Sequence, residues 1–219
     1  LGDLPDTGAG VGAGNYQTLA TNGGARNVLR NGLRLGAAID DELDGQPGVG
    51  ANGDDNNLVP DDEDGIVVAD LTAANLAAGR PGRVRANATN TTGTPARLCG
   101  YLDFNGDGDF ADAQEVAQLL VPDGSNNASF ALNFGSVPTA GTVRSTYARF
   151  RISTVAGACN GASANGVEGD GEVEDYVAAI TVSDWGDLPD SAAGTGATNY
   201  QTLAADNGHA VPDGFDRAL

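Results

Sequence analysis

Seven short runs of β-forming residues, separated by turn signals about every ten residues, constrain the fold of this chain most. In one of them, Phe130, Leu132 and Phe134 fall on the same face, because successive side chains of a strand point to opposite faces. This spacing favours an all-β fold, an antiparallel β-sandwich of about seven strands with long, irregular, acidic loops rich in Gly and Asp. The runs cover residues 65–71, 82–89, 96–104, 115–121, 128–134, 142–153 and 172–183, and residues 1–36 are expected to be irregular.

A stretch of twenty residues occurs twice in the chain. "LGDLPDTGAGVGAGNYQTLA" starts at Leu1 and "WGDLPDSAAGTGATNYQTLA" starts at Trp185, with fifteen of the twenty positions identical. A repeat at a fixed offset is the mark of one domain per period. We therefore expect one complete domain at residues 1–184 and the start of a second at residues 185–219.

The charge balance is strongly acidic. The chain has 30 Asp and Glu residues against 11 Lys and Arg, a formal net charge of −19, and all the basic residues are Arg. Such a charge argues against nucleic acid or an anionic membrane as a partner and favours bound cations. Hydrophobic residues make up 40% of the chain, enough for a packed core, and no apolar run is long enough to span a bilayer.

The segment "DFNGDGDFADAQE" is the clearest chemical signal. Side chains with oxygen atoms alternate with glycines, and calcium takes six to eight oxygen ligands in flexible geometry. A strand precedes the segment and no Glu stands at its twelfth position, so it differs from a helix–loop–helix calcium site. A polar turn that binds no metal is the alternative. The candidate calcium ligands are Asp103, Asn105, Asp107, Asp109 and Glu115.

A second acidic segment covers residues 40–64, with ten carboxylates and no basic residue. Adjacent carboxylates at about 4 Å repel by about 1 kcal/mol even at the dielectric constant of water. A bound divalent ion would remove that repulsion, whereas a solvated acidic linker is the alternative. The candidate ligands here are Asp40, Glu42, Asp44, Asp54, Asp55, Asp62 and Asp64.

A third acidic group lies in "GDGEVEDY". Glu172 and Glu174 share a face with Tyr176, which is expected in the core. A carboxylate that enters a core must be paired or must coordinate a metal ion. Calcium and a salt bridge to Arg149 or Arg151 are both open for these two glutamates.

The chain contains two cysteines, Cys99 and Cys159. An even count in an acidic chain without Met favours a disulfide and an oxidising compartment, with two buried free thiols as the alternative. The expected test is intact-mass measurement after alkylation without reductant.

These motifs together resemble the GEVED domain family. "GDLPD", "LGAAIDDELDGQP", "YLDFNGDGDFADAQE", "YARFRIS" and "GDGEVEDY" are similar to successive blocks of that family, in the same order. The resemblance implies a secreted, β-rich module of bacterial surface proteins, without catalytic activity and with acidic loops suited to calcium. As calcium ligands, the resemblance implies most directly Asp103, Asn105, Asp107 and Glu115.

The sequence offers poor material for catalysis. The only histidine, His209, lies in the partial second repeat, so the complete domain has no Ser/His or Cys/His pair. The leading interpretation is a calcium-stabilised structural module of an extracellular filament or of a repeat-containing surface adhesin. The alternative is a calcium-dependent carbohydrate-binding module for surface glycans, which needs exposed aromatic residues, and only Tyr101 and Phe110 are near the acidic loop.

The partial repeat at residues 185–219 is too short to bury a core of its own. We expect it to dock onto a neighbouring copy of the domain, and head-to-tail repetition of such a contact builds a filament. A covalent tandem array gives the same local contact. The candidate contact residues are Trp185, Asp187, Asp190 and Tyr200.

Overall fold

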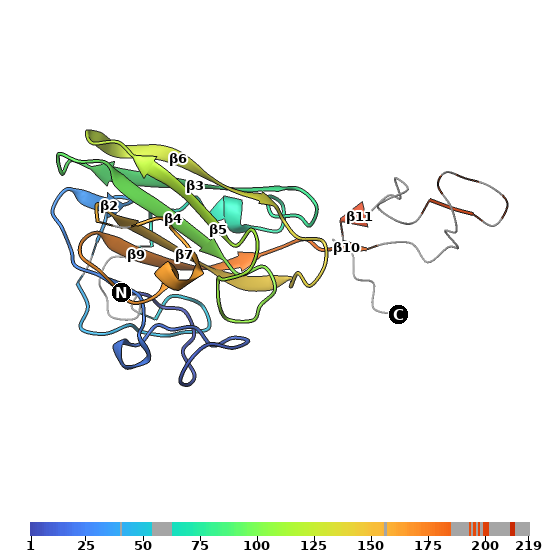
Figure 1. Ribbon diagram of the computed structural model, residues 1–219, viewed down its shortest axis with the longest axis horizontal. Coiled ribbons are helices and arrows are strands. Elements are labelled where there is room, and N and C mark those ends of the chain that lie inside the picture. The colour runs from blue at the N-terminus through green and yellow to red at the C-terminus, as the bar shows by residue number, and fades with distance from the viewer. Residues whose placement is uncertain are drawn as a thin grey trace.

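The fold is a sandwich of two antiparallel β-sheets, as the strand spacing predicts (Figure 1). The computed structural model describes residues 1–39, 41–53, 63–155, 157–184, 193, 195, 197, 199–201 and 211–212. One sheet has the strand order β2-β3-β6 and the other the order β5-β4-β7-β9. Their bounds are β2 (Leu33–Leu35), β3 (Pro81–Asn90), β6 (Ser125–Ser136), β5 (Val116–Val121), β4 (Ala96–Leu102), β7 (Ser145–Ser153) and β9 (Glu172–Ala179).

The remaining elements are short. Within the described ranges, no helix is long and apolar enough to cross a membrane. The short strands pair as β1 with β8, in parallel, and β10 with β11. They are β1 (Arg26–Asn27), β8 (Val167–Glu168), β10 (Ser183–Asp184) and β11 (Val211–Pro212), and the 3-10 helices are η1 (Ala20–Asn22), η3 (Val68–Leu71) and η4 (Gly161–Ala164).

The main core lies between the two sheets and is built by alternation along the strands. Phe150 of β7, Leu132 and Phe134 of β6 meet in it and are at most 3% exposed. Gly100 of β4 faces them, and a Cβ atom at this position would lie 2.8 Å from Leu132 Cδ1. A glycine is therefore needed where the large side chains of both sheets converge.

One predicted strand is wrong. Residues 65–71 form only an isolated bridge at Ile66, followed by the 3-10 helix η3. Asp70 is buried there, and its carboxylate accepts the backbone N–H of Arg85 and two guanidinium N–H groups of Arg85 at 2.7–2.9 Å. The N–H of Asp70 donates to the backbone oxygen of Val67 at 2.7 Å, so the run closes a 3-10 turn instead of pairing as a strand.

Other strand assignments also differ from expectation. The last predicted run, residues 172–183, ends as β9 at Ala179, because Ile180 and Thr181 bond to other segments. Conversely, β2 lies within the Gly-rich residues 1–36, which the sequence marks as irregular.

The outer face of the four-stranded sheet is also buried, beneath the N-terminal segment, which we define as residues 1–53. In Figure 1 the first residues of this segment, in dark blue, run below strands β7 and β9. The ring of Tyr16 lies 5.6 Å from that of Phe110 and 5.2 Å from that of Tyr147. The four-stranded sheet is therefore the middle layer of the domain. The second cluster of buried residues comprises Leu4, Tyr16, Ala51, Cys99, Tyr101, Phe110 and Ala164.

A buried ion pair fixes the N-terminal segment to this sheet. Arg149 of β7 and Asp175 of β9 are both fully buried, with Arg149 Nε 2.8 Å from Asp175 Oδ1. The backbone N–H groups of Asp3 and Leu4 donate to Asp175 Oδ2 at 2.7 and 3.1 Å. The carboxylate of Asp175 thus connects β9 to β7, through Arg149, and to the start of the chain, through the backbone of Asp3 and Leu4.

Candidate metal-binding loop

The loop of residues 103–115 joins β4 to β5 and begins with a buried aspartate. The carboxylate of Asp103 accepts the backbone N–H groups of Gly106 and Gly108, at 2.5 and 3.0 Å, and the hydroxyl of Tyr16, at 2.7 Å. Gly108 has a φ of +92°, and a Cβ atom there would lie 1.8 Å from Gly12 O. The glycine spacing therefore lets the loop turn tightly against the N-terminal segment.

The loop ends at a second buried carboxylate. Glu115 is 1% exposed, and its two oxygens accept the backbone N–H groups of Phe104, at 2.8 Å, and Asp112, at 3.2 Å. Burial, together with the negative charges of Asp103 and Asp112, raises the pKa of Glu115 to about 7. Burial also raises the pKa of Asp103, and the charge of Asp107 adds to that rise. The loop therefore concentrates negative charge.

Three side chains of the loop converge outside this buried pair. Asn105 Nδ2 lies 3.0 Å from Asp107 Oδ2 and 2.5 Å from Asp112 Oδ2, so one amide group bridges two carboxylates. In the part of the chain that the structure describes, no arginine pairs with either carboxylate. Sequence reasoning missed Asp112, because the turn of the loop brings its carboxylate to Asn105.

Asp109 does not belong to the convergent group. Its Oδ1 atom accepts the backbone N–H of Ala111 at 2.8 Å, and its own N–H donates to Asp107 Oδ1 at 3.1 Å. Its carboxylate closes a turn of the loop, which is a common role of Asp in loops.

The described carboxylates of the second acidic segment accept hydrogen bonds from the backbone of residues 20, 37 and 38 and from a side-chain amide. Asp44 Oδ1 accepts the N–H of Ala20 at 2.7 Å, and Asp64 accepts the N–H groups of residues 37 and 38. Glu42 accepts the side-chain amide of Gln46 at 2.9 Å. These carboxylates fasten turns of the N-terminal segment. The other predicted ligands of this segment, Asp40, Asp54, Asp55 and Asp62, lie outside the described residues.

Glu172 and Glu174 share the core face with Tyr176, as the alternation predicts. Glu172 Oε2 accepts the N–H of Leu35 at 2.5 Å, whereas Glu174 accepts the N–H of Gly65 and the hydroxyl of Tyr176, both at 3.0 Å. The bonds from Leu35 and Gly65 attach β9 to strand β2 and to the segment at Gly65.

Arg149 and Arg151 do not reach these glutamates. Glu174 is paired with Phe150 in the ladder, so the arginines beside Phe150 point to the opposite face of the sheet. There Arg149 pairs with Asp175, and Arg151 donates to Asn27 and to backbone oxygens, among them that of Asn165. The predicted salt bridge from these glutamates to Arg149 or Arg151 is therefore wrong, because Arg149 pairs instead with Asp175, the residue that follows Glu174.

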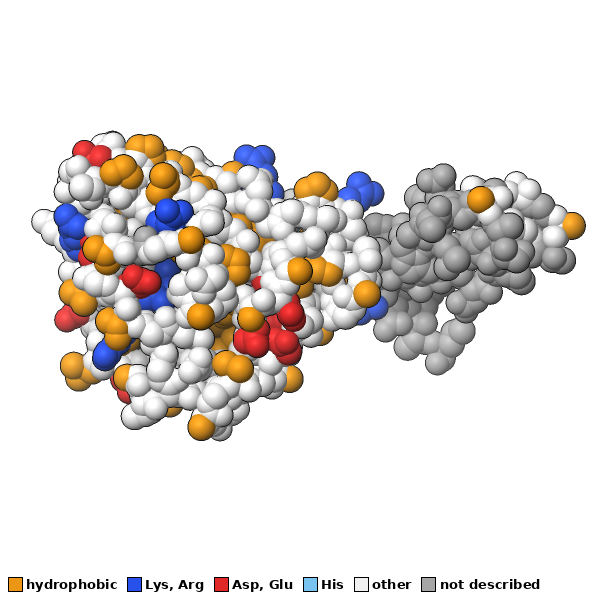
Figure 2. Space-filling model, viewed as in Figure 1, with side chains coloured by type: hydrophobic (Ala, Val, Ile, Leu, Met, Phe, Trp, Pro, Cys, Tyr) orange, Lys and Arg blue, Asp and Glu red, His pale blue; other side chains and the backbone are white. Residues whose placement is uncertain are grey.

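The second and third acidic groups approach each other, because Glu174 accepts the N–H of Gly65, the residue that follows Asp64. Among residues 1–39, 41–53, 63–155 and 157–184, no three His, Cys, Asp or Glu side chains are close enough to hold a metal ion as they stand. The loop of residues 103–115 nevertheless fits calcium in donor chemistry, because Asn105, Asp107 and Asp112 aim hard oxygen or amide groups at one point. Figure 2 shows a dense gathering of acidic side chains on the visible face.

The two cysteines form the predicted disulfide. Cys99 and Cys159 are bonded, with their Cα atoms 5.7 Å apart, which joins β4 to the segment before η4. Of the predicted inter-module residues, Tyr200 is 47% exposed. Trp185, Asp187 and Asp190 lie outside the described residues.

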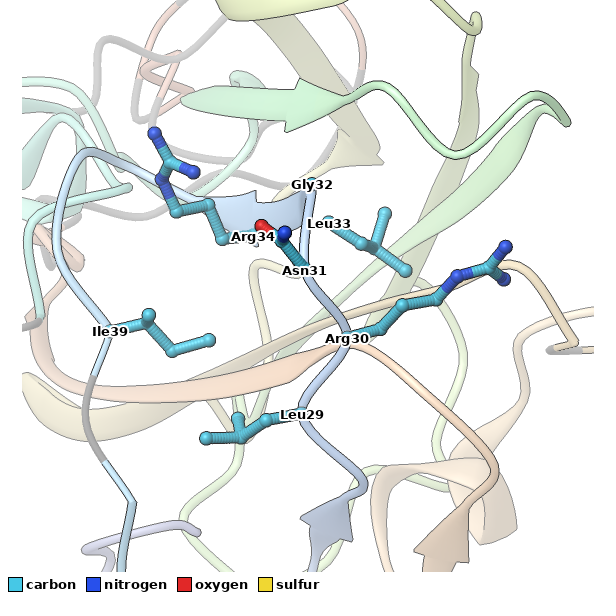
Figure 3. Close-up of a pocket in the computed structure, with 7 residues that line it drawn as sticks. All are labelled: Leu29, Arg30, Asn31, Gly32, Leu33, Arg34 and Ile39. Carbon is cyan, nitrogen blue, oxygen red and sulfur yellow. The ribbon is translucent and has the colours of Figure 1, made fainter.

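One pocket lies beside β2, away from the acidic loop. Figure 3 shows Leu29 and Ile39 on one side of it, with the guanidinium groups of Arg30 and Arg34 pointing apart. Arg30 already donates to Asp170 at 2.8 Å. The lining holds no carboxylate or histidine, so it offers no acid–base pair for catalysis.

The comparison with protein families identifies the central part of the chain. The model of the GEVED domain matches residues 97–179, which run from β4 to the end of β9. These residues are a GEVED domain. No curated protein and no solved structure matches the chain. The GEVED domain thus contains the four-stranded sheet, β6, the acidic loop and both cysteines, whereas β3 and the N-terminal segment, which includes β2, lie before the match.

The raised pKa of Glu115 predicts how stability depends on pH in the absence of divalent ions. Because the folded pKa is about 7 and the ordinary value is 4.5, the folded state binds more protons between these values. The free energy of unfolding should therefore fall as the pH rises from 4.5 to 7, by up to about 3 kcal/mol. Urea unfolding in chelator at pH 5 and pH 7.5 measures this fall.

The substitution Glu115→Gln should remove most of that pH dependence, because Gln does not titrate. Glu168→Gln is the matched control, since Glu168 lies on the short strand β8 and outside the loop. An unchanged pH dependence in Glu115→Gln would show that another group causes the fall.

Proposed function

We propose that this chain is a non-catalytic, calcium-binding structural module of a bacterial extracellular filament or of a repeat-containing surface adhesin. The convergence of Asn105, Asp107 and Asp112 supports it most directly. The amide N–H₂ now occupies the point where a cation would relieve the repulsion of both carboxylates. Rotation of the amide presents its oxygen instead, and backbone carbonyls and water complete the oxygen shell that calcium requires.

The order of the chain supports a modular role. The N-terminal segment covers the outer face of the GEVED domain, and its first twenty residues recur at residues 185–204. A segment that completes one domain and then recurs after it is the arrangement of a chain of similar modules.

The disulfide and the charge support an extracellular place for the module. Disulfides persist in oxidising compartments, and the Cys99–Cys159 bond links two parts of the GEVED domain. The net charge of −19 repels nucleic acid and anionic membranes, which leaves cations and neighbouring modules as the partners that fit.

The carbohydrate-binding alternative receives no support from the aromatic residues. Sugar rings stack on exposed aromatic faces, but Tyr101 is fully buried and Phe110 is 2% exposed. Both rings pack in the outer cluster beneath the N-terminal segment. Binding to a glycan array is the measurement that would revive this alternative.

Calcium should stabilise the fold. At a hundredfold excess over its dissociation constant, one bound ion adds about 2.7 kcal/mol, and extracellular modules bind calcium at about 10⁻⁴–10⁻³ M. We expect the melting temperature to rise in millimolar calcium, and the loop of residues 103–115 to become a protease site in chelator. Differential scanning calorimetry with limited digestion measures both effects.

The double substitution Asp107→Asn and Asp112→Asn should abolish the calcium effect, because it removes both converging charges while keeping the side-chain shapes. Glu168→Gln should keep it. The calcium proposal fails if chelator changes neither the melting temperature nor the digestion pattern of the unsubstituted chain.

A further inference from the structure

The outer face of the four-stranded sheet is a receptor site for the first twenty residues of the chain. We call this site the cradle and define it by Asp103, Tyr147, Arg149 and Asp175, which contact residues 2–18. Leu4 is fully buried in it and Tyr16 is 1% exposed.

The cradle recognises its occupant partly through backbone. Asp175 accepts the N–H groups of Asp3 and Leu4, and these donors exist in any residue except proline. Gly2 lies so close that a Cβ atom there would be 2.3 Å from Asp175 Oδ2. An occupant therefore needs a glycine at this position, followed two residues later by a side chain that fills the place of Leu4.

Residues 185–204 meet every one of these requirements. Gly186 takes the position of Gly2, Leu188 that of Leu4, and Tyr200 that of Tyr16. Yet Tyr200 is 47% exposed, whereas Tyr16 is 1% exposed. The chain thus carries two matching segments, and within the described residues one cradle, which the first segment occupies.

The internal contacts of the occupant recur as well. Asp6 Oδ2 accepts the N–H groups of Thr18 and Leu19, at 3.0 and 2.8 Å, and folds the segment back on itself. The same three residue types recur at positions 190, 202 and 203. The second segment can therefore adopt the bound fold with its own bonds.

The positions at which the two segments differ lie at the solvent-facing side of the first segment. Four of the five replaced residues are exposed, and the fifth, Leu1, is partly buried. Gly14 has a φ of +66°, which disfavours the Thr of the second segment, so the exposed turn around it must adjust. The differing residues of the first segment are Leu1, Thr7, Gly8, Val11 and Gly14.

We propose that residues 185–204 of one copy enter the cradle of a second copy and displace residues 1–20 of that copy. The proposal rests on the proposed function and names the contact by which modules join. Exchange of nearly identical segments changes few contacts, which makes it a low-cost route to association. The first segment belongs to the same chain as the cradle, so it competes at a high effective concentration. The incoming segment comes from another copy, so the exchanged fraction should grow with protein concentration.

The same substitution in the two segments should have opposite effects. Tyr200→Ser weakens only the incoming segment, so it should raise the concentration for half-association by about a hundredfold. Tyr16→Ser weakens only the resident segment, so it should lower that concentration by about a hundredfold. Sedimentation of the full chain over a series of concentrations measures both shifts.

A matched variant and a double variant control the experiment. Ala197→Ser should leave the association unchanged, because the matching residue of the first segment, Ala13, is exposed. The double variant Tyr16→Ser and Tyr200→Ser should return to association close to that of the unsubstituted chain. Non-specific aggregation through an opened outer cluster would instead persist in the double variant, and that result would overturn the proposal.

The proposal is also overturned if the unsubstituted chain and Tyr16→Ser both remain monomers, or if Tyr200→Ser and Ala197→Ser shift association equally. These outcomes are separate from a failure of the proposed function. A calcium effect on the melting temperature together with strictly monomeric chains would keep the calcium-binding module and reject the exchange.

Discussion

Replacing Arg149 with methionine should be among the most destabilising single substitutions in the domain, with a loss of about 3–5 kcal/mol. Arg149 is fully buried, and its guanidinium donates to Asp175, to the backbone oxygens of Gln17 and Ala164, and to Asn165. Methionine fills a similar volume but leaves the charge of Asp175 unpaired. Both the sheet and its attachment to the N-terminal segment should weaken.

Urea unfolding followed by far-UV circular dichroism measures this loss. Arg85→Met is the matched control, because the Arg85 side chain that pairs with Asp70 is 48% exposed, so its loss should be far smaller. Adding Asp175→Leu to Arg149→Met should recover part of the stability, since it removes the unpaired charge. Equal losses in Arg149→Met and Arg85→Met would refute the special role of the buried pair.

Removing the disulfide should cost about 4 kcal/mol. Cys99 and Cys159 are separated by 60 residues, and closing a loop of that length restricts the unfolded chain by this amount in the chain-entropy description. The double substitution Cys99→Ala and Cys159→Ala should lower the melting temperature accordingly. Cys99 lies in the outer cluster, so protection of the cradle against hydrogen exchange should fall as well.

Chemical reduction of the disulfide is the control for the double alanine variant. The unsubstituted chain in reductant should melt at the temperature of the double alanine variant, and reductant should not change that variant further. If oxidised and reduced chains melt together, the bond is without effect on the stability of the fold.

The inner face of the sandwich could be predicted from sequence, because alternation within each run is a local signal. Phe130, Leu132 and Phe134 were placed on one face, and Leu132 and Phe134 line the core, with Phe130 packed against it. The disulfide also followed from local reasoning, since two cysteines allow one pairing.

The outer face could not be predicted in this way. This face is covered by Asp3 and Leu4, which precede Asp175 in the sequence by 172 and 171 positions. Asp175 is the acid beneath this cover, because the N–H groups of Asp3 and Leu4 donate to it. Alternation places Asp175 on the face opposite Glu172 and Glu174, but it does not show that this opposite face is covered and buried. Asp112 was missed for a related reason, because the turn of the loop, and not its spacing in the sequence, brings it to Asn105.

The bond between the first residues and Asp175 has a mechanical consequence. In an array of modules, tension would enter each module near Gly2 and leave it at Ala179, the end of β9. Asp175 connects the two points, because it lies in β9 and accepts the N–H of Asp3. The pull therefore follows a short path through charge-assisted hydrogen bonds that bypasses the sandwich core and the Cys99–Cys159 bond. Under load, the attachment at Asp175 would yield first and lengthen the chain by the slack of the N-terminal segment, while the two sheets stay folded.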